Sequence, residues 1–208
     1  MLLKKKQSSD VAIAELSGDQ AIEDLGHPDA ARRREAAVVL HGAEDAVAPL
    51  IDLLQTETRP EVREAAIAAL LSVGSGDVID FFIEQLRGDE ANRRNEAVYA
   101  LQQLPEQSAD KVQALLRDSE PDVRIMAVDV VRMLTISNAA IWLRELLQKE
   151  DQPNVVGVTV DRLCEIGSIE DLPTLEQTKE RFADDPYLQF SIDLAMKRII
   201  CLDAEEPI

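Results

Sequence analysis

The chain has 208 residues, of which 46% are hydrophobic and 30% charged, and its formal net charge is −18. This composition is typical of a globular protein with enough apolar side chains to form a core. So acidic a chain repels nucleic-acid phosphates and anionic lipid headgroups, which argues against a nucleic-acid or membrane partner. No apolar run is long enough for a transmembrane helix, and the start MLLKKKQSSD does not read as a secretory signal, so we expect a cytoplasmic protein.

Residues 1–25 precede the first clear repeat, and we expect them to form an N-terminal arm and a capping helix. The tip Lys4-Lys5-Lys6 is basic on an acidic chain. Two interpretations stay open, because such a tip either docks onto a partner or another copy, or frays as a chain end.

An arginine followed three residues later by alanine recurs along the chain at a period of about 30 residues, which is typical of helical repeats. The arginines are Arg34, Arg63, Arg94 and Arg124, at spacings of 29, 31 and 30 residues. A fifth copy from Pro153 has Val156 in place of the arginine, and a sixth from Asp185 is degenerate. We expect the arginines to pair with acids of neighbouring repeats, for which the candidates are Glu61, Asp89, Asp118 and Asp122.

Each copy divides into two helical halves separated by a short polar break. The first half begins with proline in its first turn and an acid close behind, as in Ser119-Glu-Pro-Asp122, where serine is the expected N-cap. Strand and hairpin signals are weak. One such hairpin cannot bury its apolar stripe alone, whereas stacked hairpins bury each other's. The sequence therefore predicts an all-α solenoid of about five to six hairpins, with residues 26–200 as a single domain and 201–208 as a tail.

The segment DSEPDVRIMAVDVVRML, which begins at Asp118, and the later AAIWLRELLQ resemble the HEAT-like repeat first described in phycobilin lyases. The resemblance recurs in register over roughly residues 26–200. It implies a right-handed solenoid whose second helices line a concave surface. Because this repeat serves many unrelated roles, the resemblance predicts the fold more sharply than the function.

The second helices align on Leu54, Leu86, Leu116 and Leu147. In this register a buried stripe is expected at Leu50, Phe82, Val112 and Leu143. The neighbouring row on the concave surface would present Phe81, Lys111 and Trp142, and one turn away lie the acids Asp52, Glu84 and Glu145. Exposed aromatics surrounded by charge are typical anchors of protein interfaces. These six residues, Asp52, Phe81, Glu84, Lys111, Trp142 and Glu145, are the predicted partner-binding site; the alternative is that the two aromatics only pack between helices.

Catalytic signatures are missing from the sequence. His27 and His41 have no metal-ligand partner at helical spacing, and neither a nucleophile elbow nor a phosphate-binding loop is present. Cys164 and Cys201 are expected to be buried, reduced thiols. We therefore expect a non-enzymatic module without cofactor or metal that binds another protein as scaffold, adaptor or assembly factor, in an oligomeric state that the sequence leaves open. The alternative implied by the resemblance is a bilin-lyase-type subunit, or an accessory factor for cofactor or metal-centre loading.

Overall fold

The computed structural model describes residues 17–132 and 139–205. Over these ranges the chain forms twelve α-helices and two short 3₁₀ helices, without a strand, which confirms the all-α prediction. None of the helices in the described ranges combines the length and apolarity needed to cross a bilayer.

Contacts divide the chain into two compact units, residues 1–73 and 74–208. The first unit holds α1 (Gly18–Asp24), α2 (Ala30–Val39), η1 (Glu44–Ala46), α3 (Val47–Thr56) and α4 (Pro60–Val73). The second unit holds α5 (Gly76–Leu86), α6 (Ala91–Gln102), α7 (Pro105–Leu115), α8 (Pro121–Val131), α9 (Ala139–Leu147), α10 (Pro153–Ile166), η2 (Ile169–Asp171), α11 (Leu172–Arg181) and α12 (Pro186–Glu205). The sequence predicts one solenoid domain over residues 26–200, and this remains a prediction beside the two units that the contacts define.

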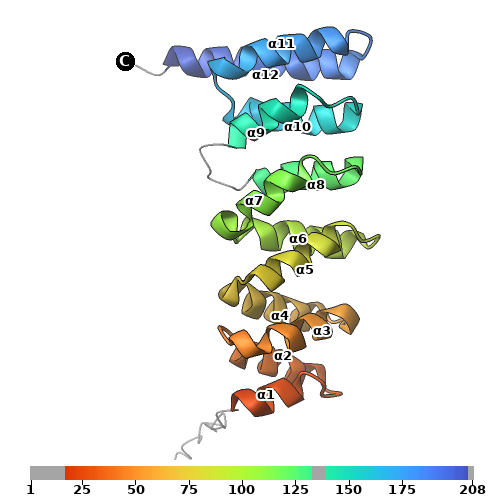
Figure 1. Cartoon of the computed structure of the whole chain (residues 1–208), viewed down its shortest axis with the longest axis vertical. Coiled ribbons are helices and arrows are strands. Elements are labelled where there is room, and N and C mark those ends of the chain that lie inside the picture. The colour runs from red at the N-terminus through yellow and green to blue at the C-terminus, as the bar shows by residue number, and fades with distance from the viewer. Residues whose placement is uncertain (1–16, 133–138, 206–208) are drawn as a thin grey trace, which may run out of the picture. The chain divides into compact units, whose positions relative to one another are not determined.

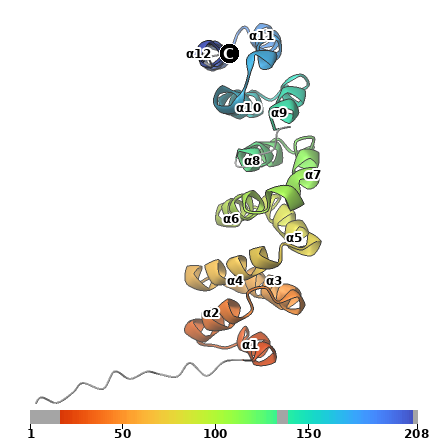
Figure 2. The same ribbon diagram turned by 90° about the vertical axis from the view of Figure 1, so that its left-hand side faces the viewer.

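The helices of each unit form two layers. In the first unit α2 packs on α4, while α1 and α3 lie against them. In the second unit α6, α8, α10 and α12 pack side by side as one layer, and α5, α7, α9 and α11 form the other (Figures 1 and 2). Successive hairpins such as α8–α9 and α10–α11 therefore cover each other's apolar faces, which is the arrangement predicted from the repeat.

Counted from the first residue of each helix, α2, α4, α6 and α8 carry the same residue types at the same positions. Position 4 is arginine in α2, α4, α6 and α8, and position 7 is an alanine without exposed surface. In α2 these residues are Arg33 and Ala36, so the alignment on Arg34 is wrong by one residue; counted from Arg33, the spacings become 30, 31 and 30. The spacing of 29 arises because both Arg33 and Arg34 are followed three residues later by alanine, so the pattern fits either arginine.

The core follows the predicted stripe. Leu50, Phe82, Val112 and Leu143 are all at most 2% exposed, and the first-layer leucines Leu70 and Leu101 are fully buried. Alanine at position 7 lets the helices of one layer approach closely, because its side chain ends at Cβ. In α10 that position is Thr159, whose hydroxyl is buried and donates to the Val155 carbonyl of the preceding turn.

Two local expectations are corrected. The N-cap of α8 is Glu120 rather than Ser119. The carboxylate of Asp118 accepts the Glu120 amide, so an acid two residues upstream replaces the expected serine. At the C-terminal end α12 runs to Glu205, beyond the predicted limit of the repeats at residue 200. The N-terminal capping helix is present as α1, whereas Lys4-Lys5-Lys6 lies outside the described residues.

Candidate functional site

Buried ion pairs connect neighbouring repeats. Arg33 donates through Nε to Glu57 at 2.6 Å, and Arg124 donates to both oxygens of Glu150 at 2.6 and 2.9 Å. The same arginines also donate to carbonyls of the loop that precedes their own helix, such as that of Asp118 for Arg124. Arg33 and Arg124 therefore each hold a loop of their own repeat and an acid of the next, which is the structural role predicted for these arginines. The acids are Glu57 and Glu150 and not the predicted Glu61 or Asp122.

The acid of each pair also organises the next helix start. Glu57 accepts the amides of Thr58 and Arg59, and Glu150 accepts the amide of Gln152. Burial alone would raise the pKa of both carboxyls, but the arginine and these amides together hold the pKa below its ordinary value. Both side chains are therefore charged at neutral pH although they are at most 7% exposed.

The series is incomplete in the middle of the chain. Glu57 and Glu150 stand three residues before the proline that opens the next helix, and the equivalent residue before Pro121 is Asp118. Asp118 pairs with Arg87 instead. The Nε atom of Arg94 is buried and has no hydrogen-bond partner in the described part of the chain. Aspartate is one methylene shorter than glutamate, which explains why this carboxylate does not serve Arg94.

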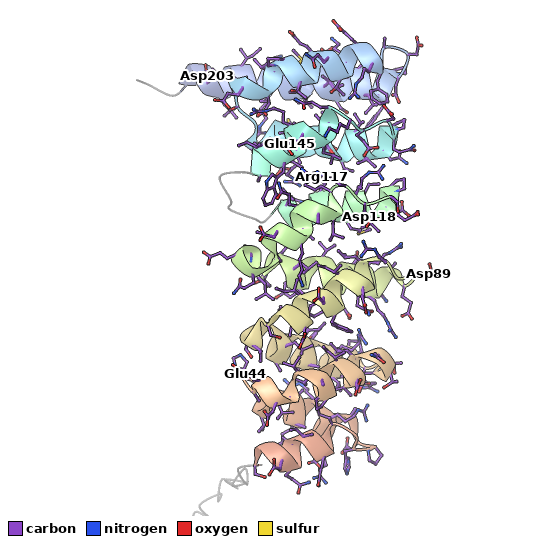
Figure 3. The ribbon with its side chains drawn as sticks, in the orientation of Figure 1. Glu44, Asp89, Arg117, Asp118, Glu145 and Asp203 are labelled. Atoms are coloured by element: carbon purple, nitrogen blue, oxygen red, sulfur yellow. The ribbon has the colours of Figure 1, made fainter. Side chains whose placement is uncertain are left out.

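A pocket of about 460 Å³ opens beside one of these pairs, between the α7–α8 and α9–α10 connections. Its apolar lining comes from Leu116, Trp142 and Leu146, and its wall at one end is the pair Arg124–Glu150. The remaining lining is polar: Gln113, Arg117, Asp118, Glu145, Lys149, Asp151 and Gln152. Arg117 on one side pairs with Glu145 on the other at 3.0 Å, so the rim carries charges of both signs (Figure 3).

The predicted aromatic row is not an exposed row. Phe81 and Trp142 are each only 8% exposed, so the expectation that they project from the surface is wrong. Phe81 packs edge to face on Phe82 with ring centroids 5.1 Å apart, because the helix turns both rings toward the core. Trp142 differs from Phe81 in that it also lines the pocket. The structure therefore brings Trp142 and Glu145 together and leaves Phe81 in the packing between helices.

Three of the four charged members of the predicted site are exposed, and Lys111 is half-buried. Asp52, Glu84 and Glu145 are exposed as expected, and Asp52 belongs to the first unit. Lys111 pairs with Asp80 on α5 and does not line the pocket. Their role in binding a partner remains a prediction.

Sequence reasoning missed the other pocket residues. Leu116 served only to align the second helices, Leu146 was not identified, and Lys149, Glu150 and Asp151 lie in the connection after α9. A usable signal did exist: an acid three residues before a helix-opening proline recurs at Glu57, Asp118 and Glu150.

The described residues contain no cluster of three or more histidine, cysteine or acidic side chains placed to hold a metal ion. Cys164 is half-buried and burial raises the pKa of its thiol, whereas Cys201 is exposed. The expectation of two buried thiols is therefore wrong for Cys201, because its position on α12 faces away from the neighbouring helices.

Comparison with known proteins agrees with the paired, stacked helices. Residues 19–102 match the family described as HEAT repeats. This part of the chain therefore contains HEAT repeats. The match covers α1 to α6, and the arginine at position 4 and the alanine at position 7 recur beyond it in α8. No curated protein matches the chain.

Among solved structures, an engineered protein is 18% identical with a TM-score of 0.43, and the alignment covers 88% of this chain and 96% of that one. The complex of CpcE and CpcF of phycocyanin lyase from Nostoc sp. PCC7120 is 17% identical with a TM-score of 0.40, covering 95% and 100%. A second engineered protein is 19% identical with a TM-score of 0.40, covering 88% and 57%. At these sequence identities and TM-scores, the three solved structures do not indicate what the chain binds.

Proposed function

We propose that the chain is a non-catalytic protein-binding module that receives a partner at the pocket around Trp142. The observation that supports this most is the placement of the chain's single tryptophan in an open pocket, between apolar walls and a rim of charged side chains. An aromatic floor inside a polar rim is the usual composition of an interface anchor. The pocket also lies on rigid elements, since the Arg124–Glu150 pair fixes the connection that borders it.

Electrostatics favours a basic partner. A net charge of −18 attracts a positively charged surface and speeds its encounter with the acidic chain. At the rim, Glu145 is exposed and held only by the exposed Arg117, so a cation of the partner can replace that weak pair at little cost. The partner segment therefore presents an apolar side chain to Trp142 beside lysine or arginine.

The test compares two variants with the same change in charge. Glu145→Lys reverses the charge at the pocket, and Glu176→Lys does so at an exposed position of α11 away from it. Wild-type protein and Glu176→Lys are expected to capture the same partner from the native cell, and Glu145→Lys is expected to lose it. With the captured partner purified, a titration should change the fluorescence of Trp142, because it is the only tryptophan.

Two results would overturn the proposal. One is equal capture by all three proteins, and the other is saturable binding of the purified partner without any change in Trp142 emission. The bilin-lyase alternative is tested by the same protein mixed with free bilin, where a shift of the visible absorbance would support it.

A further inference from the structure

Helix α12 exposes an apolar stripe on one face. Tyr187, Phe190 and Leu194 are 63%, 68% and 52% exposed, and their spacing of three and four residues places them on one side of the helix. A different face of α12 buries Leu188, Ile192, Ala195 and Ile199 against α10 and α11. Two of the chain's seven aromatic side chains thus lie largely in solvent on one helix, although the ring of Tyr187 also approaches Gly157 of α10.

The stripe is particular to α12. Helices α4, α8, α10 and α12 all begin with proline, so their positions can be compared directly. The stripe occupies positions 2, 5 and 9 of α12. The same positions are mostly polar or small in the other three helices: Glu61, Glu64 and Ala68 in α4, Asp122, Ile125 and Asp129 in α8, and Asn154, Gly157 and Asp161 in α10. An outward apolar face is therefore not a requirement of the repeat.

Charges at the two ends of the stripe are of opposite sign. One turn beyond Leu194, the exposed Lys197 and Arg198 flank the stripe on its two sides, and neither forms an ion pair within the described residues. Just before the helix, Asp184 is exposed and also unpaired there. The carboxylate of Asp185 accepts the amides of Tyr187 and Leu188 and so stays at the helix start. Along α12 the stripe therefore runs from an acidic end to a basic end.

A surface with this polarity is complementary to its own copy in reverse orientation. We propose that two copies of the chain associate through α12 in an antiparallel, two-fold arrangement. With Phe190 near the axis, Tyr187 of one copy lies opposite Leu194 of the second, and Lys197 and Arg198 face the acidic end of the second helix. Antiparallel packing also opposes the helix dipoles favourably, and a two-fold interface needs one patch that matches itself.

The size of the stripe sets the expected strength. The 20 residues of α12 extend for about 30 Å at about 1.5 Å per residue. One helix pair of this length falls at the small end of specific interfaces, below about 1,200 Å² in total, where association is weak and transient. We therefore expect a monomer–dimer equilibrium at micromolar concentrations that weakens as salt screens the end charges.

Sedimentation velocity of the full chain over a range of micromolar concentrations tests the association. Phe190→Asp places a carboxylate in the apolar centre and should weaken the dimer by about tenfold or more. The matched control is Tyr99→Asp, which adds the same charge at a 54% exposed aromatic on α6 and should leave the dimer unchanged. A chain that stays monomeric throughout, or a dimer that Phe190→Asp does not weaken, would overturn the proposal.

Two further measurements test the antiparallel orientation. Lys197→Asp should weaken the dimer, and adding Asp184→Lys to the same chain should restore it, because the two substitutions exchange the signs of facing residues. Cys201 is exposed near the far end of α12, so antiparallel packing keeps the two copies of this thiol about 30 Å apart. Mild oxidation is expected to give no disulfide-linked dimer, and efficient cross-linking through Cys201 or failure of the charge exchange would show that the orientation is wrong.

Discussion

Replacing Glu150 by glutamine tests whether the buried pairs between repeats stabilise the fold. The Glu150 side chain is 4% exposed, and its carboxylate accepts two hydrogen bonds from Arg124 and one from the Gln152 amide. Glutamine keeps the shape but removes the charge and places an NH₂ group among donors. Hydrogen bonds to charged groups contribute about 1.5–3 kcal/mol, and breaking a buried pair costs about 3–5 kcal/mol. We expect Glu150→Gln to lower the free energy of unfolding by about 2–4 kcal/mol, within these bounds.

The assay is urea unfolding followed by Trp142 fluorescence, which reports on the unit that contains both residues. With a slope of about 1–3 kcal/mol per molar urea, the midpoint should fall by about 1 M or more. Glu145→Gln is the control, because Glu145 forms an exposed pair with Arg117 for which about 0–1 kcal/mol is expected. Equal losses for Glu145→Gln and Glu150→Gln would refute the reasoning that burial makes the inter-repeat pair different from a surface pair.

Three further predictions concern acid, the middle of the chain and the core. In the folded protein the pKa of Glu57 and of Glu150 lies below its ordinary value, so the stabilisation that they contribute is full above the unfolded glutamate pKa of about 4.3 and is lost as pH falls through the lowered folded pKa. The double variant Glu57→Gln, Glu150→Gln should therefore show a flatter dependence of unfolding free energy on pH in this acid range. An unchanged dependence would contradict the pKa directions. Asp118→Glu should reach Arg94 and raise the unfolding free energy by about 1 kcal/mol, measured as a higher Tm, and a lower Tm would show the register argument to be wrong. Leu101→Ala should cost about 2–5 kcal/mol in urea unfolding, because Leu101 is fully buried, and a harmless substitution would disprove its place in the core.

Much of the candidate site was out of reach of the sequence. The pattern identified Trp142 and Glu145 on α9, yet it also placed Phe81 with them because the two aromatics share a helical register. Whether an aromatic at that register lines a pocket or packs on a neighbour depends on the connections around it. Near Trp142 the connections after α7 and α9 leave a pocket, while Phe81 packs against Phe82.

The repeat could be predicted from the sequence because the residues that define it lie close together within each copy. Apolar residues recur at helical spacing in the 30-residue copies, with proline opening α4, α8 and α10 and alanine at position 7 of α2, α4, α6 and α8. The sequence therefore determined the all-α class, the hairpins and the buried stripe of Leu50, Phe82, Val112 and Leu143. Only the tertiary structure decided that Arg33 rather than Arg34 is the paired arginine, and that Arg33 pairs with Glu57 and Arg124 with Glu150. It also decided that Tyr187 and Phe190 of α12 remain exposed to solvent. These outcomes depend on which side chains come into contact between residues about 25 positions apart in the sequence. A periodic pattern does not specify those contacts.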